Sequence, residues 1–285
     1  MIWNFVLPII ILFVAPLVGG LMRGIDRKIT AHMQGRIGPP IWQPFYDFLK
    51  LISKERIATT KASFIWVFGY LVLVIAALML LYAGNQDLLM IMLVLGFGGV
   101  CLALGAFSVK SPYSHFGALR EILQILSYEP ILLLSAVAIY LRVGTFRVEG
   151  IFEFDRPLLP YLFLVFIALL IALTIKMRKS PFDISASEHA HQEIVRGVYT
   201  EFSGPSLAII ELTHWYELVF VLSFIALFWA HPLWLGALIA IGSWLVELFI
   251  DNITARLTWG WMLRAGLLVG AGLCLINIVG GLVWA

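Results

Sequence analysis

The sequence predicts an all-α integral membrane protein with about eight transmembrane helices and a cytoplasmic interfacial amphipathic helix. Three observations support this fold class. Hydrophobic residues make up 61% of the 285 residues, charged residues make up only 13%, and the mean hydropathy is +0.97. Apolar stretches of about 20 residues, the length that crosses the hydrocarbon core, recur along the chain. Basic residues concentrate in alternate connections between these stretches.

The apolar stretches define the expected helices in chain order. The first has no basic residues before it and no small-residue cleavage motif after it, so we expect a retained helix and not a signal peptide. The seventh carries Glu247 near its end. We expect a single transmembrane domain over residues 1–285, with spans at 2–22, 62–84, 88–109, 119–141, 158–176, 205–229, 232–250 and 264–284.

The distribution of Lys and Arg predicts the orientation. If the N-terminus lies outside, 16 of the 19 basic residues fall on the inner side, and only Arg142, Arg147 and Arg156 fall outside. The positive-inside rule therefore places both termini outside the cell membrane. The two long inward segments, 23–63 and 177–204, are expected to be cytoplasmic. The net charge of +2 reflects this topology and does not indicate a nucleic-acid partner.

Part of the first inward segment has the pattern of an amphipathic helix. Its apolar residues at helical spacing are Trp42, Phe45, Phe48, Leu49 and Ile52, and its polar residues are Gln43, Asp47, Lys50 and Lys54. Such a helix lies in the headgroup plane of a bilayer. Two interpretations stay open, a lipid-surface anchor and one wall of a site at the membrane boundary.

Acidic residues inside the spans are the main functional signal. Glu211, His214 and Glu217 follow Gly204-Pro205 within a dozen residues, and residues three apart on a helix are neighbours, so His214 can reach either glutamate. Glu129 lies at a similar depth beside Pro130, which weakens its helix. Glu247 approaches from another span. Ionisable groups in hydrocarbon are costly and usually functional, so these acids predict a proton or ion path; helix–helix hydrogen bonding is the alternative.

The chain offers little for redox or hydrolytic chemistry. Cys101 and Cys274 lie in separate spans and outside any Cys-x-x-Cys pattern, so we interpret them as core residues. Iron–sulfur clusters usually take four thiolates, and no dinucleotide motif follows a strand. His189 and His191 have the His-x-His spacing of some metal sites but no matched third ligand. We therefore expect no metal, no catalytic residue and no redox centre in this chain.

Four ordered blocks together resemble one known family across nearly the whole chain. They are Ile25–Lys28 with Met33–Pro39, Gln43–Pro44 and Asp47–Leu51; Ser114–Arg120 with Ser127–Glu129; Ser180–Asp183 with Glu193–Val195 and Tyr199–Pro205; and Asp251–Asn252 with Ala255–Leu257. The family is the eight-helix membrane subunit of respiratory complex I that forms much of the quinone chamber, together with its homologue in energy-converting nickel–iron hydrogenases.

The details favour the hydrogenase branch. The stretch 188–193 and the Asp251–Asn252 block resemble that branch. Complex I subunits usually have Glu at the position of Asp26, a basic run in the last inward loop, and Glu at the position of Thr213. Here that loop carries only Arg256 and Arg264.

The resemblance implies a role as a coupling subunit. It implies a cytoplasmic arm for which segments 23–63 and 177–204 form the interface. This arm holds a nickel–iron centre and iron–sulfur clusters and accepts electrons from reduced ferredoxin. It also implies antiporter-like membrane subunits, with surrounding lipid. Glu129, Glu193 and Glu201 would belong to an acidic path that Glu211, His214, Glu217 and Glu247 extend. The residues expected to line the chamber beneath the arm are Asp26, Arg27, Arg36, Asp183, Glu188, His189, His191 and Arg196.

Other functions remain as alternatives. The nearest is the quinone-chamber subunit of a complex I-like dehydrogenase, which a bound quinone would indicate. From a different class comes a secondary ion transporter, but transporters of that kind often contain inverted repeats, and the sequence has none that we detect. A passive membrane anchor is disfavoured by the acids within the spans.

Overall fold

The computed structural model describes residues 3–55, 60–154, 156–182, 185 and 196–283, and most of them are helical. Within these residues, seven helical segments are long and apolar enough to cross a membrane, and an eighth apolar helix, α7 (Phe163–Lys176), has 14 residues. The predicted all-α membrane fold is confirmed. The seven are α1 (Trp3–Met33), α3 (Lys61–Ala83), α4 (Leu88–Phe107), α5 (Pro112–Val143), α8 (Pro205–Ala226), α9 (Leu233–Ile253) and the run of α10 (Trp259–Arg264), η3 (Ala265–Gly270) and α11 (Ala271–Val283).

Four shorter elements complete the fold. The predicted amphipathic helix is present as α2 (Gln43–Ile52), and η2 (Leu227–Trp229) forms the end of the predicted span 205–229. Helix α6 (Val148–Glu153) and η1 (Gly197–Tyr199) were not predicted. The first helix continues past residue 22 to Met33, because a helix with polar side chains is compatible with water and does not have to end where the hydrocarbon ends. Gly35, with φ of 67°, follows its C-terminal end. The fifth predicted span begins only at Phe163. Residues 158–162 form turns whose Leu158 and Leu159 amides bind the Phe228 carbonyl.

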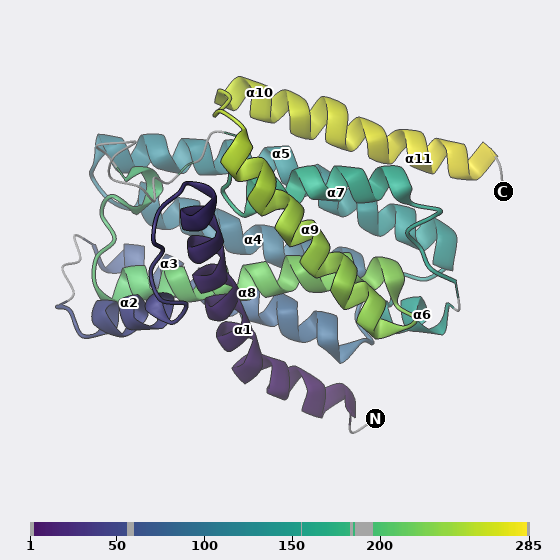
Figure 1. The fold of residues 1–285 in the computed structure, drawn as a ribbon, viewed down its shortest axis with the longest axis horizontal. Coiled ribbons are helices and arrows are strands. Elements are labelled where there is room, and N and C mark those ends of the chain that lie inside the picture. Colours follow the sequence, from purple (N-terminus) through teal and green to yellow (C-terminus); the bar gives the residue numbers. More distant parts are fainter. Residues whose placement is uncertain (1–2, 56–59, 155, 183–184, 186–195, 284–285) are drawn as a thin grey trace.

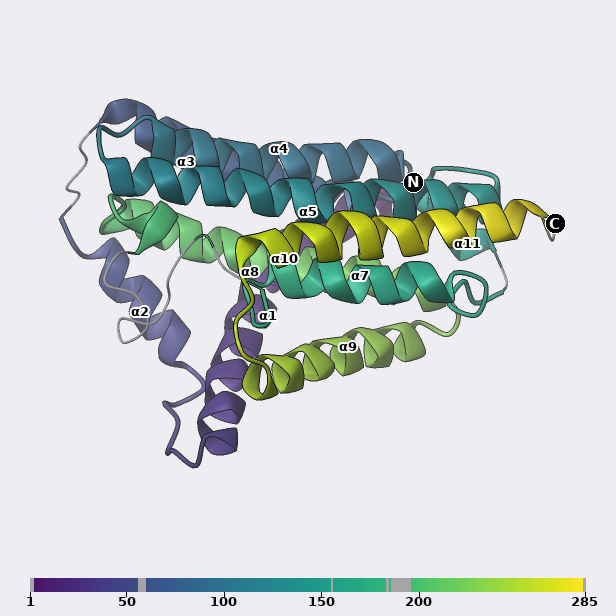
Figure 2. The same ribbon diagram turned by 90° about the horizontal axis from the view of Figure 1, so that it is seen from above.

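Most of the long helices run along one direction. Figure 2 shows α3, α4, α5, α8 and α7 side by side along the long axis, with α9 at the edge away from α3 and α4. Helices α10 and α11 lie against α5 and α7 (Figure 1), and α1 crosses the bundle at an angle. Helix α5 continues through Pro130. The end of the bundle beside α2 is called the α2 end below, and the opposite end, which carries α6, is called the α6 end.

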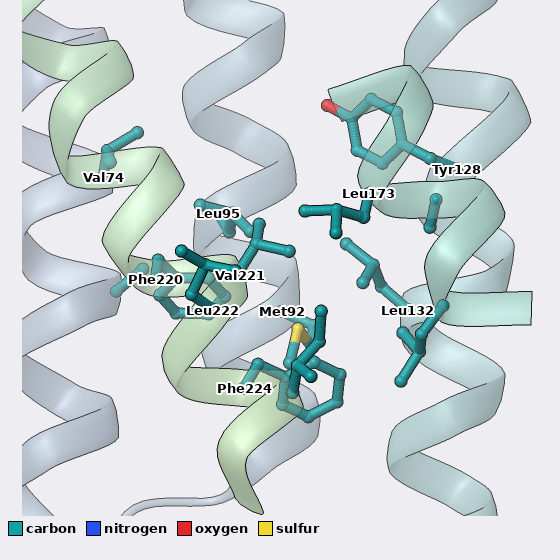
Figure 3. Packing of buried hydrophobic residues seen from close by; sticks show 14 of the residues in the cluster. Val74, Met92, Leu95, Tyr128, Leu132, Leu173, Phe220, Val221, Leu222 and Phe224 are labelled. Atoms are coloured by element: carbon teal, nitrogen blue, oxygen red, sulfur yellow. The ribbon is translucent and has the colours of Figure 1, made fainter. Parts of the chain in front are cut away.

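The centre of the bundle is an apolar core. Figure 3 shows Met92 and Leu95 of α4 facing Leu132 of α5, Leu173 of α7 and the Phe220–Phe224 segment of α8. Leu95, Leu173 and Phe220 are fully buried. This core occupies the middle of the long axis, so any polar path must begin at an end of the bundle.

Candidate functional site: a buried charge cluster

Five ionisable side chains gather where α5, α7 and α8 meet at the α2 end. They come from segments far apart in sequence. Four of them have side-chain exposures of 8% or less, and the fifth, the histidine, has 17%. This buried charge cluster consists of Glu121, Lys176, Arg178, His214 and Glu217.

Two ion pairs hold the cluster together. Lys176 Nζ lies 2.9 Å from Glu217 Oε1, and Arg178 Nη2 donates to Glu121 Oε1 at 2.9 Å. The Ser185 hydroxyl donates to the second oxygen of Glu121. Breaking such a buried pair by removing one partner typically costs about 3–5 kcal/mol, because the other charge is left uncompensated. The cluster is therefore a set of mutually dependent charges.

His214 connects the two pairs. Its Nδ1 lies 3.2 Å from Glu217 Oε2 and 3.2 Å from the Tyr70 hydroxyl. Its Nε2 lies 2.5 Å from the Tyr199 hydroxyl and 3.4 Å from Arg178 Nη1. Arginine only donates, so these partners assign the proton to Nδ1, where it points at the glutamate, and leave Nε2 as the acceptor. An imidazole in this arrangement can take a proton on one nitrogen and release one from the other.

A second acid lies beyond Lys176. The Lys176 ammonium donates to the Tyr128 hydroxyl at 3.3 Å and lies 4.7 Å from the centre of the Tyr128 ring. Glu129 follows on the same helix, and its carboxyl group packs against Gly96 of α4, where a Cβ atom would come within 2.7 Å of the carboxyl carbon. Glycine at position 96 thus makes room for the acid. Among the described residues, one Glu129 oxygen is buried without a hydrogen-bond partner.

A small cavity lies between the cluster and α1. It has a volume of about 40 Å³, and its lining includes Asp26 of α1 together with Lys176, His214 and Glu217. That volume is enough for one or a few water molecules. Asp26 itself pairs with Lys179 at 2.8 Å. Lys179 also approaches Asp251, which accepts a hydrogen bond from the Ser180 amide.

Four other predicted residues lie apart from the cluster. Glu211 does not meet His214 and instead lines a separate groove between α1, α2 and α8, because its side chain leaves α8 on a different side. Arg27, paired with Asp47 at 2.8 Å, and the exposed Arg196 line the same groove. Glu201 is half-buried in the turn before α8.

Two further predicted residues extend the region toward α9. Arg36 is exposed after α1 and donates to Gln34, whose amide donates to Asn252 at 3.3 Å. Glu247 of α9 is fully buried. Within the described chain its carboxyl oxygens lack a hydrogen-bond partner, because the Thr174 hydroxyl, the polar group it approaches on α7, donates to the Leu170 carbonyl.

The remaining predicted residues fall outside the described residues. They are Asp183, Glu188, His189, His191 and Glu193. In the portion that is described, no group of three or more His, Cys, Asp or Glu side chains could hold a metal ion. The His-x-His pattern therefore has no structural test.

Two basic residues and one acid of the cluster were not predicted as site residues from the sequence. Lys176 and Arg178 contributed only to the predicted orientation, and Glu121 was not among the candidate residues. A signal for Glu121 did exist, because it precedes Tyr128 by seven residues, two helical turns, and so shares its face of α5. Tyr70 carries no comparable signal in the sequence, and Tyr199 was noted only as the first residue of the block Tyr199–Pro205.

Comparison with known proteins identifies the family. A family model described as NADH dehydrogenase matches residues 5–281. Hydrogenase-4 component C of Escherichia coli (strain K12) is 33% identical over 217 residues, which are 70% of this chain and 66% of that protein. An NADH-quinone oxidoreductase subunit of Solibacter usitatus (strain Ellin6076) is 33% identical over 250 residues, 78% of this chain and 62% of that protein. The chain thus spans a little under two thirds of the length of these two relatives.

A solved structure matches over the full length. It is a chain of the membrane-bound sulfane sulfur reductase (MBS), an archaeal respiratory membrane complex, with a TM-score of 0.85 and 26% identity over 98% of this chain and 99% of that one. The named relatives are thus components of oxidoreductase or respiratory membrane complexes. This chain, with its multi-span fold and its homology to a hydrogenase-4 component and an NADH-quinone oxidoreductase subunit, belongs to the NADH dehydrogenase family.

Proposed function

We propose that this chain is the membrane coupling subunit of an ion-pumping, energy-converting hydrogenase complex. It anchors a peripheral arm that carries a nickel–iron centre and iron–sulfur clusters, and it contacts antiporter-like membrane subunits. Electrons pass from reduced ferredoxin to protons within the arm, and this chain holds no redox centre. It relays the released energy to proton or sodium translocation across the cell membrane, with both of its termini outside.

The buried charge cluster is the observation that carries this proposal. Buried ion pairs are seldom a net gain in stability over apolar packing, so five ionisable groups beneath one end of a membrane bundle favour a functional role. In this proposal the small cavity beside Asp26 provides access from the α2 end. Glu247 is fully buried and Glu129 is half-buried, and each has a buried carboxyl oxygen without a hydrogen-bond partner among the described residues, so both are suited to receive charge further in.

The geometry supports a proton relay with defined steps. A proton arriving from the cavity binds His214 Nε2, and the Nδ1 proton passes to Glu217 Oε2. Neutral Glu217 no longer balances Lys176, which then turns toward the Tyr128 hydroxyl and Glu129. Each transfer therefore moves a positive charge deeper into the bundle. The direction of proton transfer depends on which of the two ion pairs, Lys176–Glu217 or Arg178–Glu121, the arm disturbs first.

The arm itself would rest on the polar surface of the α2 end. On this surface Arg36 is exposed and Glu201 is half-buried. We assign Asp183, Glu188, His189, His191 and Glu193 to the same interface on the resemblance alone. Electron transfer in the arm would shift the Arg178–Glu121 pair, because Arg178 lies at the start of the inward segment 177–204, which contacts the arm in this proposal.

The second candidate function is the quinone-chamber subunit of a complex I-like dehydrogenase. It is favoured by the 33% identity with an NADH-quinone oxidoreductase subunit. The cavity beside the cluster, at about 40 Å³, is far smaller than the several hundred Å³ typical of small-molecule sites. The remaining alternative, a secondary ion transporter, would function as a single chain, without a peripheral arm or partner subunits.

The deciding experiment is purification of the native complex through a tag on this chain. The same sample is assayed for nickel, for hydrogen evolution from reduced ferredoxin, and for reduction of a quinone and of a polysulfide. Nickel with hydrogen evolution supports the proposal. Quinone or polysulfide reduction without nickel assigns the chain to another member of its family, and transport by the isolated chain would establish the transporter.

A further inference from the structure

A second polar site lies in the groove between α1, α2 and α8, separate from the buried charge cluster. Its volume is about 220 Å³. Five basic side chains line it against two acidic ones, and one of the acids, Asp47, is already paired with Arg27 at 2.8 Å and hydrogen-bonded to Gln43. The groove is therefore positive. Its basic residues are Arg23, Arg27, Lys50, Lys54 and Arg196.

Close packing fixes the walls of this groove. The rings of Phe45 and Phe48 on α2 lie 5.2 and 5.5 Å from the ring of Trp215 on α8. On the other side, a Cβ atom at Gly20 of α1 would come within 2.6 Å of Phe45 Cζ, so only glycine allows α1 and α2 this contact. Phe48, Leu51, Leu207 and Trp215 give the groove an apolar floor.

The outer side of α2 indicates what surrounds the groove. Tyr46, Leu49 and Ile52 are 59%, 61% and 50% exposed. Large apolar side chains on a short helix with basic residues beside them are typical of a helix lying at the headgroup level of a bilayer. Lys50 and Lys54, both exposed, then stand at the depth of the lipid phosphates.

We propose that this groove binds the headgroup of one anionic phospholipid. Lys50, Lys54 and Arg196 would hold the phosphate oxygens by charge-assisted hydrogen bonds, and the glycerol and upper acyl chain would lie on Phe48 and Trp215. The positive charge selects for an anionic headgroup, whereas an uncharged quinone ring would gain nothing from it. This site does not depend on which reaction the peripheral arm performs.

The test measures lipid binding to the native complex in detergent by native mass spectrometry. Three forms are compared: wild type, Lys50→Gln/Lys54→Gln, and a control, Lys28→Gln/Lys110→Gln. The control removes two exposed lysines of the same end that do not line the groove. Phosphatidylglycerol is titrated against phosphatidylcholine, which has the same phosphate and acyl chains but no net charge.

We expect wild type and control to bind phosphatidylglycerol alike and to prefer it to phosphatidylcholine. The groove variant should bind it about tenfold or more weakly, because each basic residue near the lipid surface contributes to binding. Arg196→Gln, on another wall, should weaken binding in the same direction. It keeps the test informative if the double variant does not assemble.

Four results would overturn the proposal. One is equal binding of phosphatidylglycerol by all the forms, and another is equal binding of the two lipids by wild type. Displacement of the lipid by inorganic phosphate at matched ionic strength would make the groove a site for a free anion. Competitive displacement by a short-chain quinone would make it a site for an uncharged ring.

Discussion

The two ends of the bundle use the same charged residue types in opposite ways. At the α2 end, Lys176 and Glu217 are almost completely buried and paired at 2.9 Å. At the α6 end, Arg142, Arg147 and Glu149 are exposed. Water hydrates and screens exposed charges, so the charged side chains of the α6 end do not need ion-pair partners. The α2 end must compensate every charge it buries, which is why its charges form a connected cluster.

The cavities at the two ends also differ in how many charged side chains line them. The cavity beside the cluster is about 40 Å³ and has six ionisable side chains in its lining, whereas a hollow of about 290 Å³ at the α6 end is lined mainly by leucine, isoleucine, alanine and glycine. Arg142, Tyr161 and Asn277 are the polar residues there, and the Arg142 guanidinium lies 3.8 Å from the centre of the Tyr161 ring. Size alone therefore does not identify the functional end; buried charge does.

The largest effect is expected from breaking the Lys176–Glu217 pair. Lys176→Met leaves Glu217 buried and uncompensated, which should cost about 3–5 kcal/mol of stability. Replacing both residues, as Lys176→Met/Glu217→Leu, should recover most of that loss. Unfolding of the complex in a denaturant titration measures both values. A loss below about 1 kcal/mol for the single variant would show that the pair behaves like the exposed charges of the α6 end.

Glu121→Gln should lower ion translocation without lowering the redox activity of the arm. Arg178 loses that counter-charge and stays beside His214 Nε2, the nitrogen that must accept a proton. A lost charge-assisted hydrogen bond of this kind changes an equilibrium by about tenfold or more. Ion translocation into vesicles should fall accordingly, while arm activity with a soluble dye persists. Glu149→Gln at the α6 end is the matched control, and equal pumping by the two variants would contradict the role of Glu121.

Gly96→Ala tests whether the position of the Glu129 carboxyl group matters for ion translocation, and it should change stability little. The added Cβ meets the end of a flexible carboxyl side chain, which can move aside, so the cost in stability should stay within about 1 kcal/mol. The displaced carboxyl should nevertheless slow ion translocation. Gly69→Ala is the control, because its Cβ would meet only the Cys101 sulfur at 3.7 Å. Identical translocation rates in the two alanine variants would argue against a fixed position for Glu129.

The smallest effect is expected at the α6 end. Arg147→Gln removes an exposed charge, and the bridge between residues 87 and 147 is made by the main chain and should persist. Stability should change by no more than about 0.5 kcal/mol, and translocation should be unaffected. Denaturant titration and vesicle assays check both values. A large loss of pumping would mean that the path also uses surface charges of the α6 end.

The class of fold and most of its elements could be predicted from the amino-acid sequence. Continuous apolar stretches fix where spans lie, because a bilayer accepts only helices or barrels of the right length. The alternation of apolar and polar residues determined α2. The acids Glu129, Glu217 and Glu247 were recognisable because ionisable groups in such stretches are rare and costly.

The pairing of the charges depends on tertiary packing and could not be predicted from the sequence. Arg178 lies 57 residues from Glu121, and Lys179 lies 153 residues from Asp26. Hydropathy says little about how a membrane helix is rotated, since lipid accepts any apolar face. The same rotation separated Glu211 from His214 and directed it into the groove. Packing of helices against one another, and not composition, thus determined which of these residues form one site.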